Sequence, residues 1–437
     1  MSSRTGSERR AVALAFGCNF VLLGSYYILR PVRDTVATIV GVAHLQALFT
    51  ATFVGTLIAS ALYAALASRV RLTRLLPGVF WFWLANVLAF MWLFRVLPQS
   101  GGLGSAYYVW FSVVNLFMIS VFWSLMVDIF SSDQAIRWFP LIAAGGALGA
   151  IAGPLATRAL VKMLGLSGLM LLAALGFACV IVLVHLLMRE KRALRQGSSD
   201  VQRSSLDHSL RGNFLEGFIK LMRSSYFLSQ AAFILLMTWV NTVAYFCQTD
   251  LIARSYSAVA DRAQAIADID LVVNVCTAAI LLLGLGRFTR RFGVTASLSL
   301  NPLLMVLAFA ATAVSPTLLV IQLLQVVRRV AQYAIARPSR EVCFTVVEQS
   351  SRYKAKSVID TVVYRFGDAS SAWLQSGLMS LGYGLDGAIV LGISASLVWG
   401  GVALRLGRRY SALRATRAES QRAFAVADGC RNAAGGI

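Results

Sequence analysis

The stretch SGLMLLAALGFACVIVLVHLLM, Ser167 to Met188, contains no Asp, Glu, Lys or Arg and is long enough to cross a bilayer as a helix. Similar apolar stretches recur along the 437 residues, of which 58% are hydrophobic and 14% are charged. In lipid, backbone polar groups must be satisfied inside the structure. The alternation over short strands that is typical of a membrane barrel is absent. The sequence therefore predicts an all-α polytopic membrane protein.

The apolar stretches predict about twelve transmembrane helices by length and composition. The expected spans are 11–40, 45–67, 76–97, 105–130, 139–163, 167–188, 227–252, 264–286, 295–315, 317–338, 357–381 and 385–406. Three arginines near the N-terminus precede the first span, but no small-residue cleavage site follows. We therefore expect a retained first span rather than a signal peptide.

The net charge of +21 is concentrated in alternate loops and in the tail. The loops 68–75 and 287–293 are basic, whereas 98–106 carries no Lys or Arg. By the positive-inside rule, both termini and the central loop are expected in the cytoplasm, in a bacterial inner membrane. The position of the basic residues in loops therefore predicts contact with lipid and no nucleic-acid partner. A monomer is the expected oligomeric state.

The two halves of the chain align at one constant interval. The pairs that share this interval are Tyr26 with Tyr245, Ser68 with Arg287, and Ser131 with Ser350. It predicts two parallel six-helix repeats, as in major-facilitator transporters, with the substrate site near the membrane midplane.

The repeats also define the expected domains. These are a bundle 1–188, a cytoplasmic linker 189–225, a second bundle 226–406 and a basic tail 407–437. Within the linker, Leu210, Phe214, Phe218 and Leu221 recur at helical spacing. They indicate either an amphipathic helix on the inner membrane surface or an extension of the seventh span.

In a major-facilitator fold the first, fourth, seventh and tenth spans line the central cavity, and each carries polar residues at helical spacing. The candidate substrate-binding residues are Tyr26, Tyr27, Arg30, Arg33, Asn115, Asn241, Tyr245, Gln248, Gln325, Arg329 and Gln332. A central arginine costs about 2.5–3.5 kcal/mol on insertion scales, so it should face protein or water. The four stripes together favour a wet, cationic cavity over ion pairs that only hold helices together.

Acidic residues and one further arginine are candidates for coupling or gating. These are Asp34, Asp128, Asp268, Asp270, Asp360, Arg365 and Asp368. Asp268 and Asp270 are expected near the outer end of the eighth span, as a gate, a proton site or interfacial residues. Arg158 and Lys162 are expected to be anchors that snorkel. The cluster around Arg365 is expected to be an interhelical lock or a coupling site.

The first span ends in SYYILRPVRDT, Ser25 to Thr35, which places charges and a proline in an apolar helix. Arg30 and Asp34 are four residues apart and can pair along one face, which would leave Arg33 for a ligand. Pro31 should bend or break the helix. A helix that restarts after Pro31 would direct its positive N-terminal end at an anion.

Other motifs limit the function. The fifth span contains Gly149-x-x-x-Gly153-Pro154, which resembles the antiporter signature of major-facilitator proteins, although close helix packing would also explain it. No G-x-x-x-x-G-K-[ST] loop is present, so a nucleotide-hydrolysing pump is not expected. The six scattered cysteines indicate neither disulfides nor zinc. We expect no enzyme activity, no cofactor and no metal.

Three stretches resemble motifs of the ATP/ADP (nucleotide) translocases of plastids and intracellular bacteria and of their free-living bacterial relatives. They are YYILRPVRDT at 26–35, FWSLMVDIFSSDQAIRWFPLIAAGG at 122–146 and KAKSVIDTVVYRFGDASS at 354–371. The resemblance covers most of the chain and implies nucleotide transport within the major facilitator superfamily. It implies functional roles for Arg33 first and then for Arg30, Asp34, Asp360 and Arg365.

Three positions depart from the family pattern. Arg33 stands where the family has lysine. The positive charge is kept, but a planar guanidinium, which can donate two parallel hydrogen bonds, replaces a compact ammonium group. Asn115 stands where the family has glutamate, and Asp368 stands where it has lysine. The resemblance therefore implies transport by the same fold but does not carry ATP/ADP exchange over to this chain.

Three hypotheses follow. The first is a secondary transporter of an organic anion, with nucleotides as candidates, that works by alternating access with exchange as one mode. The second is a proton-coupled exporter of drugs or metabolites. The third is a membrane scaffold or sensor that has lost transport and would tolerate neutralised cavity arginines.

Overall fold

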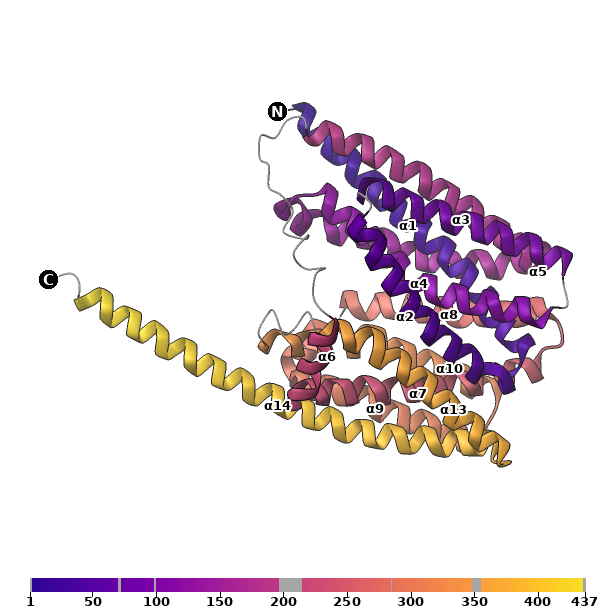
Figure 1. Cartoon of the computed structure of the whole chain (residues 1–437). Coiled ribbons are helices and arrows are strands. Elements are labelled where there is room, and N and C mark those ends of the chain that lie inside the picture. Colours follow the sequence, from indigo (N-terminus) through magenta and orange to yellow (C-terminus); the bar gives the residue numbers. More distant parts are fainter. Residues whose placement is uncertain are drawn as a thin grey trace. The chain divides into compact units, whose positions relative to one another are not determined.

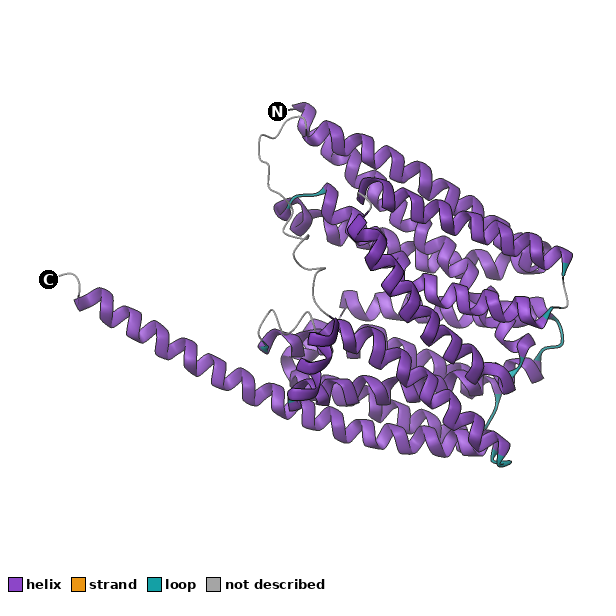
Figure 2. Ribbon diagram, viewed as in Figure 1, coloured by secondary structure: helices purple, strands orange, loops and turns teal. Residues whose placement is uncertain are grey.

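The structure is a computed structural model that describes residues 2–69, 72–97, 100–195, 214–283, 285–347 and 355–434. All regular structure in these ranges is helical (Figures 1 and 2). Ten of the helices found there are long and apolar enough to cross a membrane. The predicted all-α membrane protein is confirmed.

The helices of the first part of the chain follow the expected spans. They are α1 (Ser2–Val40), the short η1 (Val42–His44), α2 (Leu45–Arg69), α3 (Leu72–Val96), α4 (Gly101–Ile129) and α5 (Ser132–Arg195). α5 is two helices joined at Gly165, whose φ of 64° only glycine adopts readily. The apolar part of α5, Arg137–Glu190, has 54 residues, so it covers both the fifth and the sixth expected span.

The second part of the chain begins with α6 (Phe214–Arg223), α7 (Ser225–Ser255), α8 (Val259–Leu283) and α9 (Leu285–Val314). It continues with α10 (Leu318–Val330), a π-helical segment η3 (Ala331–Ala336), α11 (Arg337–Cys343) and η4 (Phe344–Val346). It ends with the π-helical segment η5 (Ile359–Val363), α13 (Tyr364–Ser380) and α14 (Gly384–Ala434). The expected eleventh span lies at η5 and α13; it carries Asp360, Arg365 and Asp368 and is not among the ten apolar helices.

Two compact units make up the chain, and each is described by itself. Unit 1 contains residues 1–211 and 245–278, so it includes the second part of α7 and most of α8. Unit 2 contains residues 212–244 and 279–437. The predicted bundles 1–188 and 226–406 place residues 245–278 in the second half instead, and their boundaries stay a prediction.

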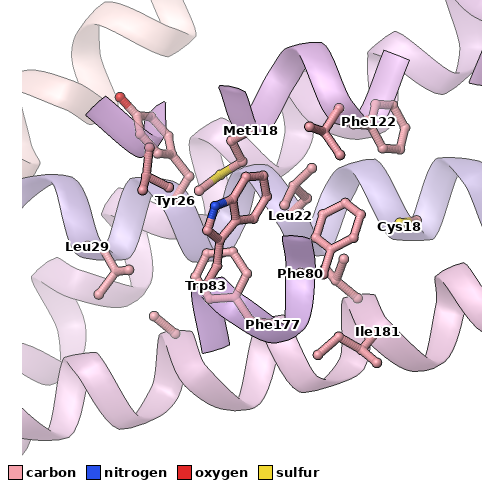
Figure 3. Close-up of a cluster of buried hydrophobic side chains, with 14 of the residues drawn as sticks. Cys18, Leu22, Tyr26, Leu29, Phe80, Trp83, Met118, Phe122, Phe177 and Ile181 are labelled. Carbon is pink, nitrogen blue, oxygen red and sulfur yellow. The ribbon is translucent and has the colours of Figure 1, made fainter. Parts of the chain in front are cut away.

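The core of unit 1 is formed by α1, α3, α4 and α5. Leu22, Trp83, Phe122 and Phe177 are buried in it, and the rings of Trp83 and Phe177 lie 6.5 Å apart (Figure 3). Van der Waals packing of these large side chains holds the four helices together. The polar residues near the C-terminal end of α1 are therefore presented by a packed scaffold.

α1 and α5 approach each other closely along a line of glycines. A Cβ atom on Gly149 would meet the carbonyl oxygen of Phe20, and one on Gly153 would lie 2.5 Å from the carbonyl oxygen of Gly24. Only glycine allows the backbones to come this near. The glycine motif of the fifth span therefore has a packing role, while its resemblance to an antiporter signature stays a prediction.

Two expectations about helix breaks have clear outcomes. α1 continues as one helix through Pro31 to Val40, so the predicted helix restart after the proline is wrong. Pro31 is buried in unit 1, where tertiary packing offsets the lost hydrogen bond.

α6 is separated from α7 at Ser224, so the linker helix is not an extension of the seventh span.

On α6, Leu221 is buried whereas Phe218 and Met222 are exposed. Of the residues expected on its apolar face, Leu210 lies outside the described ranges. The location of α6 on the inner membrane surface stays a prediction.

Candidate functional site

Arg33 and Asp34 form the centre of a charged and aromatic cluster in unit 1. The Nε atom of Arg33 donates to Oδ1 of Asp34 at 2.9 Å, and Nη2 reaches the same oxygen at 2.5 Å. Nη1 lies 3.5 Å from the hydroxyl oxygen of Ser112 on α4. The predicted pair of Arg30 with Asp34 is therefore wrong, and the ligand role of Arg33 stays a prediction.

Arg30 pairs with a residue of another helix. Its Nη1 lies 3.5 Å from Oδ1 of Asp270 on α8, and the Asp270 side chain is fully buried. The guanidinium of Arg30 also lies over the ring of Tyr27, 5.7 Å from its centroid. The sequence placed Asp270 near the outer end of the span, whereas the structure places it inside unit 1 against α1.

Aromatic rings surround Arg33. Its guanidinium carbon lies 5.3 Å from the ring centroid of Tyr108 and 5.8 Å from that of Phe111. Tyr26 stacks on Phe111 with centroids 5.4 Å apart and planes 8° from parallel. Guanidinium groups are attracted to the faces of such rings, and this orients Arg33. Tyr26, one of the aromatic residues predicted for the site, therefore contacts Phe111, whose ring lies next to Arg33.

Tyr245 joins α7 to the same cluster. Its hydroxyl donates a hydrogen bond to Oδ1 of Asp34 at 3.1 Å. Its ring packs edge-on against Phe49 of α2, with centroids 5.9 Å apart. One carboxylate therefore receives hydrogen bonds from both the guanidinium of Arg33 and the phenol of Tyr245. The structure brings together predicted residues from the first and seventh spans.

α8 makes further polar contacts with α5 and α1. Arg158 pairs with Asp268 at 3.0 Å, and Lys162 pairs with Asp261 at 3.1 Å. Arg158 and Lys162 were expected to be snorkelling anchors, but both contact acidic residues of α8. Asn274 of α8 donates to the backbone carbonyl of Ala150 at 2.6 Å. These contacts tie α8 to α5 along several turns.

Arg262 was not recognised from the sequence because it stands in a polar segment near the start of α8. Its guanidinium donates to the carbonyl oxygens of Tyr256 at 2.8 Å and Ala253 at 3.1 Å. It also reaches the carbonyl of Thr38 on α1 at 3.4 Å. Arg262 therefore connects the turn between α7 and α8 to the end of α1.

The remaining predicted residues of unit 1 are less closely connected to this cluster. Asn115 and Asp128 are partly exposed on α4, whereas Gln248 is buried on α7. Their substrate-binding or coupling roles stay predictions. An apolar pocket of about 880 Å³ lies nearby, lined by residues that include Ile39, His44 and Trp110. The charged side chains of the cluster do not line this pocket.

Unit 2 has its own polar cluster, centred on Arg328. Nη1 of Arg328 donates to Oδ1 of Asn241 on α7 at 2.8 Å. Nε and Nη2 donate to Oε1 of Gln325 at 2.9 and 2.7 Å. The sequence predicted Arg329 for this role, but the Arg329 side chain is buried, with 3% of the residue exposed. Gln332, in η3, is also buried.

A second group in unit 2 joins α13 to α7. Oδ2 of Asp368 lies 3.5 Å from Nη1 of Arg365, and the hydroxyl of Thr242 lies 3.4 Å from Oδ1. A Cβ atom on Gly367 would meet the hydroxyl of Thr238, so the two helices are close here. Asp368 is buried in this contact. A coupling role for Asp368 stays a prediction.

Asp360 belongs to a different group from Asp368. Arg340 of α11 donates to Asp360 at 2.7 Å, and Lys356 contacts Glu341 at 2.5 Å. The sequence placed Asp360 and Asp368 on one face, with Arg365 between them, but the structure pairs Asp360 with Arg340 and Asp368 with Arg365. Arg340 was missed because it occurs in a short basic stretch that reads as a loop.

Comparisons with known proteins define the fold. No family model matches the chain. The chain is 21% identical over 274 residues to "ADP,ATP carrier protein 1" of Chlamydia pneumoniae, a match that covers 58% of this chain and 52% of that protein. The match therefore spans about half the length of this curated relative.

Three solved transporters illustrate the structural likeness. A bacterial homologue of the iron transporter ferroportin has a TM-score of 0.64 at 12% identity and covers 91% of this chain and 98% of its own. A POT family transporter in complex with 5-aminolevulinic acid has a TM-score of 0.63 at 14% identity, with coverages of 92% and 96%. The nucleoside transporter NupG has a TM-score of 0.61 at 15% identity, with coverages of 93% and 98%.

These likenesses establish the class of fold. The chain is an integral membrane protein with the major-facilitator fold, as the repeat pattern predicted. Its sequence is similar, at low identity, to an ADP,ATP carrier protein.

Proposed function

We propose that the chain is a secondary transporter that carries an organic anion by alternating access, with nucleotides as the first candidates. The observation that carries this proposal is Arg33, which lies close to the rings of Tyr108 and Phe111 and is hydrogen-bonded to Asp34 in a membrane-spanning helix. Membrane-embedded charges of this kind usually serve a transported ligand. The fold of known transporters supports the same interpretation.

The residues around Arg33 suit a ligand with two chemical parts. A guanidinium binds phosphate or carboxylate through two parallel hydrogen bonds. Tyr27, which is partly exposed, suits a planar ring, because aromatic rings stack on one another. A molecule that has both a ring and an anionic group satisfies both features. The low-identity match to an ADP,ATP carrier protein supports nucleotides as the first substrates to test.

Asp34 serves as the counter-ion of Arg33 when no substrate is bound. The pair lies within a single helix, and the Asp34 side chain is 7% exposed. A substrate anion would replace the carboxylate on the guanidinium, because both groups use the same donors. Exchange is the proposed mode, since an anion on one side would restore a favourable partner for Arg33 before the next cycle.

Flux measurements in proteoliposomes test the proposal. The purified chain is given a panel of labelled nucleotides and other organic anions, with and without unlabelled substrate inside. Saturable uptake that requires internal substrate is expected. Arg33→Ala should abolish this uptake, and Arg33→Lys should retain part of it. Unchanged uptake by Arg33→Ala would exclude this site.

A control variant shows whether loss of any arginine abolishes uptake, or only loss of Arg33. Arg254 pairs with Asp250 on the same helix at 2.9 Å, and its side chain is 69% exposed. Arg254→Ala should leave uptake close to that of the unaltered chain. Equal losses in both variants would indicate a general effect on folding or insertion.

Proton-coupled export is a second candidate. The carboxylates of Asp34 and Asp368 each contact an arginine inside a membrane-spanning helix, an arrangement that suits proton exchange as well. A pH gradient would then drive flux without substrate on the opposite side. The same proteoliposomes distinguish the two modes, because an exchanger remains inactive under that condition.

The cellular setting belongs to the same proposal. Both termini are proposed to lie in the cytoplasm of a bacterial inner membrane, and the protein is proposed to act as a monomer. The basic loops support this orientation. Cysteine accessibility at the two ends of α14 would test it.

A further inference from the structure

In unit 2, the guanidinium of Arg328 is held by two neutral amide oxygens. Gln325 accepts two of its hydrogen bonds and Asn241 accepts a third, at 2.7 to 2.9 Å. An amide oxygen fixes the direction of a guanidinium as a carboxylate does, but it contributes no negative charge. The two amides therefore orient Arg328 and leave its charge to be balanced by other groups, among them Asp368 of α13, which interacts with it electrostatically.

The Gln325 amide is itself fixed in one orientation. Gln325 is fully buried, and its Nε2 donates to the backbone carbonyl of Ala244 on α7 at 2.7 Å. With the nitrogen directed at this carbonyl, the oxygen faces Arg328. The contact joins α10 to α7 at the level of the arginine, and rotation of the amide would break hydrogen bonds at both ends.

The helices around Arg328 contain more positive than negative charge. α10 contributes Arg328 and Arg329, and α13 contributes Arg365 and Asp368. The part of α7 in unit 2, residues 225–244, contains no charged residue. Whichever way these four side chains pair, positive charge is in excess. Such an excess inside a membrane protein is costly and is expected where an anion binds.

We propose that Arg328 is an anion-binding residue of unit 2, and that Asn241 and Gln325 are the residues that position it. The ligand group is a phosphate or carboxylate of the transported anion. The inference rests on the proposed function only in taking the substrate to be anionic, because Arg33 and its cluster lie in unit 1. Arg328 is partly exposed, whereas Arg329 is buried, so Arg328 is the accessible member of the pair.

Asn241→Asp is the decisive variant. It keeps the size of the side chain and the oxygen that accepts from Arg328, and it adds the negative charge that the site does not receive from asparagine. If Arg328 binds an anion, this internal carboxylate competes with the ligand and affinity falls. If Arg328 only holds α10 against α7, the charged hydrogen bond is stronger and nothing is lost.

Binding of pyrophosphate to the purified full-length chain, measured by isothermal titration calorimetry in a buffer free of phosphate and carboxylate anions, provides the readout. We expect binding by Asn241→Asp and Arg328→Gln to weaken about ten- to a hundredfold, the range for losing a hydrogen bond to a charged group. Asn241→Leu should weaken it less, because the charge of Arg328 remains. Thermal unfolding of each variant shows whether the fold is retained.

Arg409→Gln is the matched control. Arg409 donates to the backbone and hydroxyl oxygens of Ser225 near the start of α7, so it is another interhelical arginine of unit 2. Its variant should bind pyrophosphate as the unaltered chain does. Unaltered affinity in Asn241→Asp, or no pyrophosphate binding by the unaltered chain, would overturn the inference.

The two proposals fail in different ways. If flux does not require Arg33, the proposed function is wrong. If flux requires Arg33 but Asn241→Asp keeps its affinity for pyrophosphate, only the proposed role of Arg328 is wrong.

Discussion

Tyr245 of α7 donates a hydrogen bond to Asp34 of α1 at 3.1 Å, and the same carboxylate oxygen accepts from Arg33. The contact joins two helices that are more than two hundred residues apart in the chain. A ligand that takes Arg33 from Asp34 therefore also changes the charge environment of Tyr245.

Tyr245→Phe should weaken substrate binding while leaving the fold intact. The ring and its contact with Phe49 remain, and only the hydrogen bond to Asp34 is lost. A hydrogen bond to a charged group contributes about 1.5–3 kcal/mol, so KM for uptake should change at least severalfold. Uptake kinetics in proteoliposomes measure the effect. An unchanged KM and rate would show that the hydroxyl has no part in transport.

Breaking the Arg30–Asp270 pair should destabilise unit 1. Asp270 is fully buried, and removal of one partner leaves a charge in a place that water does not reach. Such changes cost about 3–5 kcal/mol. Arg30→Ala should therefore lower the unfolding temperature in detergent clearly. The double variant with Asp270→Ala should be less damaged than the sum of the two single changes, and additive losses would contradict a direct pair.

Gly149→Leu should prevent α1 and α5 from packing. A Cβ atom alone would meet the carbonyl oxygen of Phe20, and the larger side chain cannot be accommodated without separating the helices. Folded protein recovered by size-exclusion chromatography should fall sharply. Gly17→Ala is the control, because a Cβ atom at Gly17 meets nothing within 4 Å and should be neutral or stabilising by up to about 1 kcal/mol.

Charge reversal should test the contact between α5 and α8. Arg158 and Asp268 are both partly exposed, so each contributes little to stability, about 0.2–1 kcal/mol. The interaction should instead affect transport if α5 and α8 separate during the cycle. Arg158→Asp and Asp268→Arg should each alter the uptake rate, and the double exchange should restore it. Failure of the double variant to recover would argue against a direct contact.

The fold could be predicted because lipid imposes it. Apolar stretches of sufficient length must be helices, and the constant interval between the two halves indicated the repeat. Breaks inside one long helical element were harder to predict from the sequence. The joint at Gly165 is visible in the sequence, whereas continuation of α1 through Pro31 depends on packing that the local sequence does not contain.

The members of the site could be predicted better than their partners. Spacing along one helix pairs Arg30 with Asp34, but it cannot reveal that Asp270 approaches from α8. Adjacent residues of a helix point about 100° apart, and the polar stripe on α10 selected Arg329. The contact between Arg328 and Asn241 of α7 depends on how the two helices pack, which spacing along one helix does not show.

Arg33 and Asp34 are neighbours in a single helix, and this has a consequence for the empty carrier. When α1 changes its position, both charges travel together, so their attraction survives the movement. Contacts such as Arg30 to Asp270 join different helices and must lengthen if those helices part. In the proposed exchange, the empty carrier is therefore held by contacts between helices, such as Arg30 to Asp270, and not by the Arg33–Asp34 pair, which moves with α1.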